Sequence, residues 1–160
     1  MKAFLRLADR LAALVRVATV GLAVVMLVAL ALQVLMRYVF GKALSWTEEL
    51  ALGCFTWTML LAVSLGVRDA IHVRMDLLVD RLSERARRVA EGAILVAVAA
   101  FGLFLAWSGW RYLLDTQGMT SAAIGYPIGY LYAAAPVTGA LIALFCAERL
   151  LRSFGRPDAR

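Results

Sequence analysis

Long apolar runs without charge alternate with short charged segments along the chain. Four runs are long enough to cross a bilayer, whose core of about 30 Å needs about 20 helical residues, with about 17 tolerated. The runs are continuous and lack the alternation of a membrane β-strand, so they predict helices. We therefore expect an all-α integral membrane protein, a single domain over residues 1–160, with four transmembrane helices near residues 17–36, 50–67, 92–110 and 126–147.

The composition supports a membrane protein and argues against several classes of function. Apolar residues fill 63% of the 160 positions, against about 45–50% in soluble domains. The net charge of +6 is spread over the flanks of the apolar runs, so there is no single basic face and we expect no nucleic acid partner. His72 is the one histidine, which excludes a haem held by two imidazoles. Cys54 and Cys146 lie inside apolar runs, so we expect buried, inert thiols.

Orientation follows from the distribution of positive charge. Fourteen of the 17 Lys and Arg residues lie in the N-terminal segment, the loop between the second and third runs, and the C-terminal tail. Because positively charged loops stay in the cytoplasm, both termini are expected there. The first run continues past Ala29 and Ala31 to Met36, which favours a retained span over a cleaved signal peptide. Aromatic residues near the outer boundary fit an interfacial belt: Tyr38, Trp46, Trp107, Trp110, Tyr112, Tyr126, Tyr130 and Tyr132.

Two interpretations stay open for the loop between the second and third runs. Apolar residues recur there at helical spacing, so residues 71–82 could form an amphipathic segment on the membrane surface. The same stretch could instead extend the third helix into the cytoplasm. Beyond Ser83, which suits an N-cap, the extension is favoured because Glu84 and Arg88 can form an i,i+4 pair.

Nothing in the predicted spans resembles a catalytic or transport site. They contain no Asp, Glu, Lys, Arg or His, whereas an ion-coupled carrier usually keeps an ionisable residue within the bilayer. His72 and Asp76 lie in the loop, and one imidazole with scattered carboxylates is a poor set of metal ligands. We expect no catalytic, cofactor or metal site, and a chain that supports a partner.

Three segments carry a resemblance to a known family. They are RYVFGKALSWTEEL at 37–50, VRDAIHVRMDLLVDRL at 67–82 and GYPIGYLYAAAP at 125–136. Together they resemble the small permease subunit of tripartite ATP-independent periplasmic (TRAP) transporters. The matching positions are Arg37, Tyr38, Phe40, Trp46, Thr47, Glu48, Glu49, His72, Asp76, Gly125, Pro127, Gly129 and Tyr132. Gly41 departs from the family pattern, which often has Asn there, so that turn is expected to be looser.

The resemblance implies a small, non-catalytic subunit of a sodium-driven secondary transporter in the bacterial inner membrane. A large permease subunit would hold the substrate and sodium sites, so this chain would bind no cofactor. A periplasmic solute-binding protein would deliver organic anions such as carboxylates. The small subunit would scaffold the large one, contact membrane lipid and help dock the binding protein. The alternative is a four-helix membrane enzyme or redox accessory protein that uses His72 and nearby carboxylates.

Candidate interface or structural residues follow from the resemblance and from local chemistry. Ser45 and Glu48 fit a capping box at the start of the second helix. Glu49 is then left to pair with Arg37 or with a basic group on the large subunit. The outer loops, near residues 42–46 and 116–123, are expected to face the binding protein, and proline suits the first turn of the fourth helix. The candidates are Arg37, Tyr38, Lys42, Trp46, Glu48, Glu49, His72, Asp76, Pro127 and Tyr132.

Overall fold

The computed structural model describes residues 2–69 and 84–154, which form helices joined by short connecting segments. In chain order these are α1 (Lys2–Tyr38), α2 (Ser45–Arg68), α4 (Glu84–Asp115), the short α5 (Gly129–Tyr132) and α6 (Ala134–Phe154). Four stretches are long and apolar enough to cross a membrane: Phe4–Tyr38, Ser45–Arg68, Val89–Asp115 and Gly129–Arg152. The predicted all-α fold with four membrane-spanning helices is confirmed.

The helices extend beyond the apolar runs that predicted them. α1 begins at Lys2, far ahead of residue 17, because its first turns are rich in strong helix formers such as Leu, Ala and Arg. Ala12 and Val15 in this extension are also buried against neighbouring helices. α4 begins at Glu84, as expected from an extension of the third helix beyond residue 83. Residues 71–82, for which the sequence leaves open both an amphipathic surface segment and a helix extension, and the Ser83 cap lie outside the described residues.

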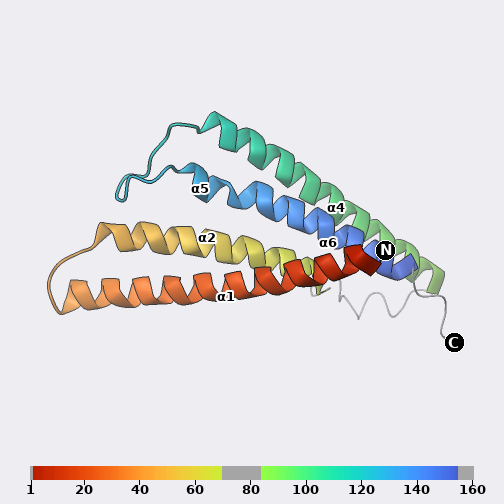
Figure 1. Cartoon of the computed structure of the whole chain (residues 1–160), viewed down its shortest axis with the longest axis horizontal. Helices are drawn as coiled ribbons and strands as arrows, with labels where there is room; N and C mark the ends of the chain where they lie inside the picture. Colours follow the sequence, from red (N-terminus) through yellow and green to blue (C-terminus); the bar gives the residue numbers. More distant parts are fainter. Residues whose placement is uncertain (1, 70–83, 155–160) are drawn as a thin grey trace.

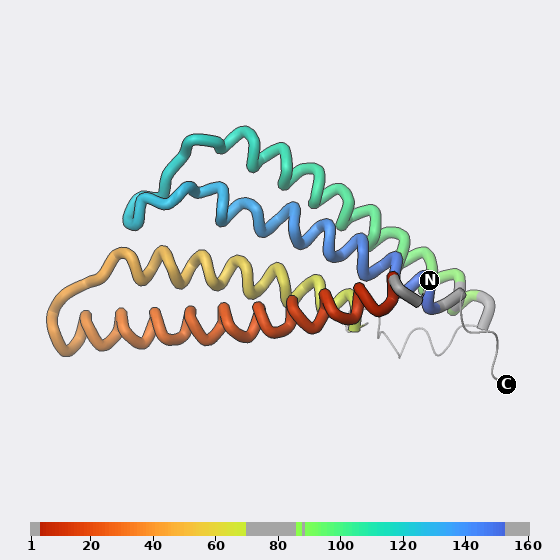
Figure 2. The backbone as a smooth tube through the Cα atoms, in the orientation of Figure 1, coloured from red at the N-terminus to blue at the C-terminus, as the bar shows by residue number. Residues whose placement is uncertain are grey.

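The helices form two hairpins that diverge like the arms of a V (Figure 1). One arm consists of α1 and α2, and the other of α4 and α6. The arms meet where α1 begins and α6 ends, and they separate toward the connecting segments 39–44 and 116–128, as the trace in Figure 2 also shows. We call the junction, which contains Asp9, Arg68 and Glu148, the clasp end, and the opposite end, which contains the two connecting segments, the loop end.

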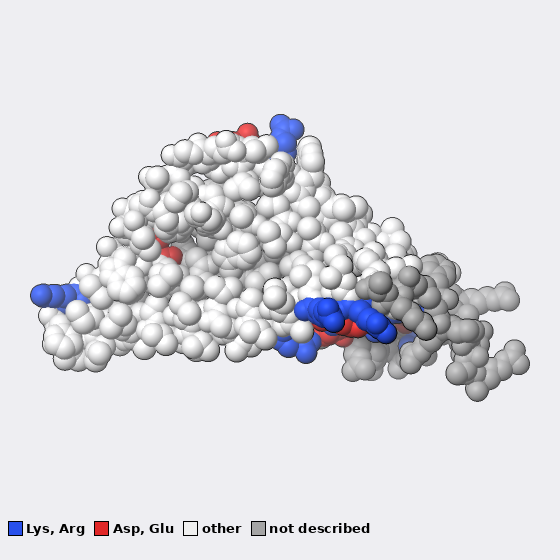
Figure 3. All heavy atoms as spheres, in the orientation of Figure 1, with Lys and Arg blue, Asp and Glu red and all other residues white. Residues whose placement is uncertain are grey.

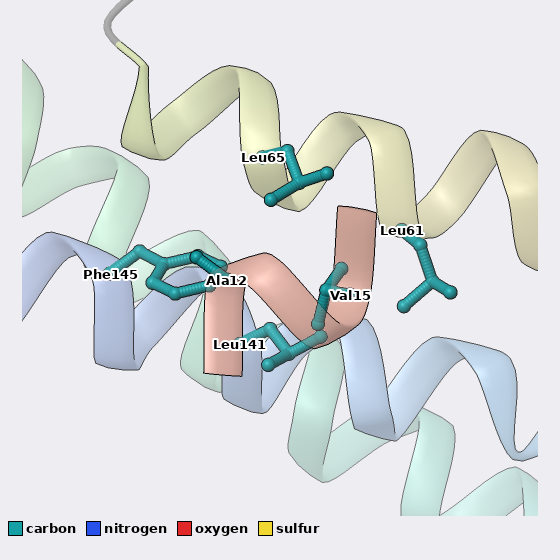
Figure 4. Close-up of a cluster of buried hydrophobic side chains, with 6 residues drawn as sticks. All are labelled: Ala12, Val15, Leu61, Leu65, Leu141 and Phe145. Carbon is teal, nitrogen blue, oxygen red and sulfur yellow. The ribbon is translucent and has the colours of Figure 1, made fainter. Parts of the chain in front are cut away.

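An apolar cluster joins the arms near the clasp end (Figure 4). Its side chains come from α1, α2 and α6: Ala12, Val15, Leu61, Leu65, Leu141 and Phe145. Inside a bilayer, leaving lipid for another helix gains little hydrophobic free energy, so such a cluster stabilises the junction through close van der Waals contact. The Phe145 ring also lies 5.7 Å from the Arg68 guanidinium carbon, which connects the apolar cluster to the charged residues beside it.

Glycines allow α4 and α6 to approach closely within their arm. A Cβ atom added at Gly139 would lie 2.5 Å from the carbonyl oxygen of Gly102, and one added at Gly109 would lie 2.8 Å from Cδ of Pro136. Both separations are shorter than any real Cβ contact, so only glycine fits at these positions. Small residues at helix contacts are the usual way in which membrane helices achieve tight packing.

Much of the remaining helix surface is apolar and exposed. Val17 and Val20 of α1, and Phe101 and Leu103 of α4, are each more than half exposed. On the face shown in Figure 3, the largest group of Lys and Arg lies toward the clasp end, with small patches at the left tip and at the top, and the helix surface between them is almost entirely uncharged. This distribution suits a protein whose helix surfaces face lipid or another membrane protein and whose ends lie at the two interfaces.

Candidate functional site

Four charged side chains meet at the clasp end. Glu148 of α6 is 1% exposed, and both of its oxygens accept from Arg68 of α2, whose Nε and Nη2 lie 3.0 and 2.9 Å away. Arg152, one turn further along α6, donates Nη2–H to Oε1 of Glu148 over 2.7 Å. Asp9 of α1 accepts from both arginines, with 2.7 Å to Nη2 of Arg152. We call these four residues the clasp.

The clasp offsets the cost of burying charge with well-aligned hydrogen bonds. Removing a carboxylate and a guanidinium from water is expensive, and only close pairing with good geometry offsets that cost. The fork of Arg68 matches the two oxygens of Glu148 as a bidentate pair, which is stronger than a single hydrogen bond. Because the four residues come from three helices, the clasp fixes how the two arms of the V meet.

Two further contacts surround the clasp. Arg149 donates Nη1–H to the carbonyl oxygen of Val67 over 2.9 Å, which satisfies an acceptor in the last turn of α2. Arg16 pairs with Asp69 over 3.0 Å, but both side chains are substantially exposed, at 61% and 40%. An exposed pair contributes only about 0–1 kcal/mol, so the buried Glu148 rather than Arg16 is the main polar link at this end.

At the loop end, Glu48 does not cap its own helix. α2 begins at Ser45, its N-cap residue is Leu44, and the Leu44 side chain makes no capping hydrogen bond. Glu48 instead accepts a 2.6 Å hydrogen bond from Nε2 of Gln33 on α1. The predicted capping box is therefore wrong. Ser45 already lies inside the first turn, so its side chain is not placed to accept from the free backbone N–H groups at the start of the helix. The Gln33 amide, in turn, is within reach of the Glu48 carboxylate.

Glu49 binds the segment that precedes α5. Its Oε2 accepts from the backbone N–H groups of Ala123 and Ile124, over 3.2 and 2.8 Å. The pair with Arg37 considered from the sequence is not formed among the described residues, and the Arg37 side chain is exposed. Glu49 thus links α2 in one arm to the connecting segment of the other arm.

The 116–128 segment, which we call the outer loop, is held in shape by its own backbone hydrogen bonds. Thr120 and Pro127 form an isolated antiparallel bridge, so Pro127 lies ahead of α5 and not in its first turn as expected. The Pro127 carbonyl accepts from the N–H of Tyr130 over 3.1 Å. Trp57 of α2 donates its indole N–H to the Tyr130 carbonyl over 3.0 Å, a second link between the arms.

A cleft of about 370 Å³ lies between these two links. Its walls are mostly apolar and come from α1, α2 and the segment around α5, including Leu22, Gly53, Trp57, Tyr126 and Leu131, with Glu49 also in its lining. Since the lining brings no second carboxylate and no basic side chain to Glu49, the cleft has the character of a packing gap rather than of a polar ligand site.

Comparison with known proteins identifies the family. The family model described as "Tripartite ATP-independent periplasmic transporters, DctQ component" matches residues 25–156. The chain belongs to this family. It is accordingly a multi-pass protein of the inner membrane, with its four candidate spans as the membrane segments.

Three relatives give the scale of the similarity. The small permease protein DctQ of a C4-dicarboxylate TRAP transporter from Rhodobacter capsulatus is 32% identical, over 72% of this chain and 50% of its own length. A DctQ protein of the same description from Vibrio cholerae is 29% identical, over 49% of this chain and 34% of its own length. The sialic acid TRAP transporter permease protein SiaT of Haemophilus influenzae is 34% identical, over 69% of this chain and 18% of its own length. The chain therefore spans half or less of the length of these relatives.

Membership of the TRAP family decides between the two classes of function. Its members are permease components of transporters and not enzymes, so the alternative of a membrane enzyme that uses His72 is not supported. His72 and Asp76 lie outside the described residues. Within residues 2–69 and 84–154, no group of three or more His, Cys, Asp or Glu side chains is arranged to hold a metal ion.

The remaining candidates of this TRAP subunit lie at the loop end. Tyr38, Lys42 and Trp46 are exposed, which leaves them available to a partner or to lipid headgroups. The Tyr132 ring packs edge-on against Tyr112 of α4, with centroids 4.7 Å apart. Gly41 adopts a φ of 64°, a conformation that Gly and Asn tolerate best, so glycine can form this turn where the family often has Asn.

Sequence reasoning missed the clasp entirely. It used Arg68 and Arg152 only as topology markers and left Asp9 and Glu148 without a role. A local signal existed, because Glu148 and Arg152 have the i,i+4 spacing of a helix pair. The decisive contact was not visible, since Arg68 and Glu148 are 80 residues apart in the sequence and meet only when α2 packs on α6.

Proposed function

We propose that this chain is a small, non-catalytic subunit of a sodium-driven TRAP transporter. In this proposal it scaffolds the large permease subunit and helps dock the periplasmic solute-binding protein. The observation that carries the proposal is the V of two helical arms, held by a buried ionic clasp at one end and by Glu49 and Trp57 toward the other. An arrangement tied at both ends suits a static support better than a moving transport path.

The position of charge supports the same division of labour. Substrate and ion paths through membranes are marked by ionisable residues facing the protein interior. In the described spans, the buried carboxylate is Glu148, and the clasp arginines already occupy it at the end of α6. We therefore assign the sodium and solute sites to the large subunit and expect no cofactor in this chain.

The exposed apolar surfaces of α1 and α4 provide room for a membrane partner. Large apolar side chains line both helices, among them Val24 and Leu27 on α1 and Phe104 and Trp107 on α4. We assign part of this surface to the large permease subunit and the rest to lipid. The orientation is part of the proposal: the clasp end, which is rich in arginine, faces the cytoplasm, and the loop end faces the periplasm.

Organic anions are the proposed substrates of the whole transporter. The relatives are described as C4-dicarboxylate and sialic acid transporter components, and both kinds of solute carry carboxylates. The described residues of this chain offer no cluster of cations facing an enclosed site, so we assign recognition of the solute to the partner proteins.

Reconstitution tests the proposal directly. Proteoliposomes that contain this chain alone should show no uptake of a labelled dicarboxylate or sialic acid under an inward sodium gradient. Uptake should require this chain, the large permease subunit and the binding protein together, and it should stop when the sodium gradient is collapsed. Sodium-dependent flux by this chain alone, or full transport without it, would overturn the scaffold role.

A further inference from the structure

The outer loop is a folded unit in its own right. The Ser121 N–H donates to the Tyr126 carbonyl over 2.9 Å, and the Ile128 N–H donates to the Met119 carbonyl over 3.0 Å. Between these hydrogen bonds and the tip of the loop, the Gly125 N–H donates to Oγ of Ser121 over 3.1 Å. Gly125 has a φ of 76°, the left-handed conformation that glycine tolerates best and that lets the tip reverse direction.

Glu49 supplies a hydrogen-bond acceptor for backbone N–H groups at the tip of the outer loop. The N–H groups of Ala123 and Ile124 are at the turn, and both converge on one oxygen of Glu49. Successive backbone N–H groups that converge on one carboxylate oxygen form a strong, charge-assisted contact. The carboxylate comes from α2, near its N-terminal end, so the tip is anchored to the opposite arm of the V and not to its own.

The anchored loop presents an uncharged surface beyond the helix ends. Met119 and Ile124 are 55% and 46% exposed, and Gln117 and Thr120 beside them are also exposed. The helical surface below is continuous and regular, whereas this projection can insert into a hollow on a soluble partner. Methionine adapts its shape to such a partner more readily than branched side chains do.

We propose that Glu49 is a positioning residue that holds the outer loop ready to receive the periplasmic solute-binding protein. The inference rests on the proposed function, which places the loop end in the periplasm. A loop that is ordered before binding loses less conformational entropy when the partner docks, and affinity rises accordingly. Glu49 acts through the loop backbone and does not itself touch the partner.

Two variants and one control test this role in the complete transporter. Glu49→Gln replaces the charge-assisted contact with a neutral and weaker one. Ser121→Ala removes the hydroxyl that accepts from the Gly125 N–H and that also hydrogen-bonds Glu49, and it leaves the carboxylate in place. Glu48→Gln is the matched control, because Glu48 lies on the same turn but binds Gln33. Hydrogen–deuterium exchange of the peptide spanning residues 119–126 measures the order of the loop. Uptake at increasing concentrations of binding protein measures docking.

We expect both loop variants to raise the exchange rate of this peptide by about fivefold or more. Glu49→Gln loses the hydrogen bonds to a charged carboxylate, and Ser121→Ala loses hydrogen bonds that support the loop. The half-saturating concentration of binding protein should rise by a similar factor, about fivefold, while maximal uptake changes less than about twofold. Glu48→Gln should leave both quantities near the parent values.

Each other outcome overturns the inference in a distinct way. Unchanged exchange in Glu49→Gln means that Glu49 does not order the loop. Faster exchange with an unchanged half-saturating concentration means that the loop is not the receiving surface. A fall in maximal uptake alone places the role of Glu49 in assembly with the large subunit. If the transporter takes up solute equally well without this chain, the proposed function fails. The exchange experiment still tests, independently of transport, whether Glu49 orders the loop.

Discussion

Arg68 on α2 and Glu148 on α6 form a bidentate ion pair, with N···O distances of 3.0 and 2.9 Å. Glu148 is almost completely buried, and the Arg68 side chain is 17% exposed. This pair connects the two arms of the V beside the apolar cluster, since the Arg68 guanidinium carbon lies 5.7 Å from the centroid of the Phe145 ring. The angle between the arms therefore depends on a contact between one residue from each arm.

Glu148→Gln tests the clasp. The substitution leaves Arg68 and Arg152 facing a neutral amide, and breaking a buried ion pair typically costs about 3–5 kcal/mol. We expect a loss near the lower end, about 3 kcal/mol, because Asp9 still accepts from both arginines. Thermal or denaturant unfolding of the purified protein in detergent would measure it.

Glu91→Gln is the matched control for the clasp. Glu91 accepts from Arg87 at i,i+4 on α4, and both side chains are about half exposed. An exposed helix pair of this kind contributes only about 0.3–0.5 kcal/mol. Equal losses of stability in Glu148→Gln and Glu91→Gln would show that the buried ion pair of the clasp contributes no more to the free energy of unfolding than an exposed pair does.

Gly139→Ala should weaken the arm formed by α4 and α6. The added methyl group would overlap the backbone of α4 near Gly102 and Ala106, and overpacking of this kind costs about 1–3 kcal/mol. Gly21→Ala is the opposite case, because no atom lies within 4 Å of the added carbon. There the gain in helix propensity should stabilise the protein by about 0.5–1 kcal/mol. Unfolding midpoints that move in the same direction for both variants would contradict the packing of Figure 1.

Reporter fusions test the orientation. A reporter that is active only in the periplasm should give signal when fused after Gln117 and none when fused after residue 82, because the loop that contains residue 82 carries the larger share of positive charge. The reverse pattern would place the clasp end outside the cell and reject the proposed topology.

Cross-linking tests which end meets the binding protein. Cysteine introduced at Lys42 or Gln117, both exposed at the loop end, should form cross-links to the binding protein in the assembled transporter. The native Cys54 and Cys146 are buried, so a water-soluble reagent reaches mainly the new thiol. Cysteine at Arg16, which is exposed near the clasp end, is the control and should give none. Cross-links from Arg16 alone would refute the placement.

The sequence by itself determined the number, type and approximate position of the membrane helices. Hydropathy is a local property, and a continuous apolar run of sufficient length has few alternatives to a helix in a bilayer. The pattern around Glu48, Glu49 and Trp46 also indicated the family, since it depends on residue order alone. The same local reasoning failed at Ser45, because the residue at which a helix begins depends on the turn before it and on Gln33 of the neighbouring helix.

Only the tertiary structure decided which charged groups meet. Glu49 binds backbone N–H groups more than 70 residues away, and Glu148 binds Arg68 across 80 residues. Local spacing carries no information about such contacts, because they form only when helices from different parts of the chain pack at a particular angle. The packing of α4 on α6 depends on the close approach of Gly102 and Gly139, and the junction of the two arms depends on the apolar cluster around Phe145. The physical reason is that packing is cooperative over the whole bundle, whereas hydropathy acts on each segment separately.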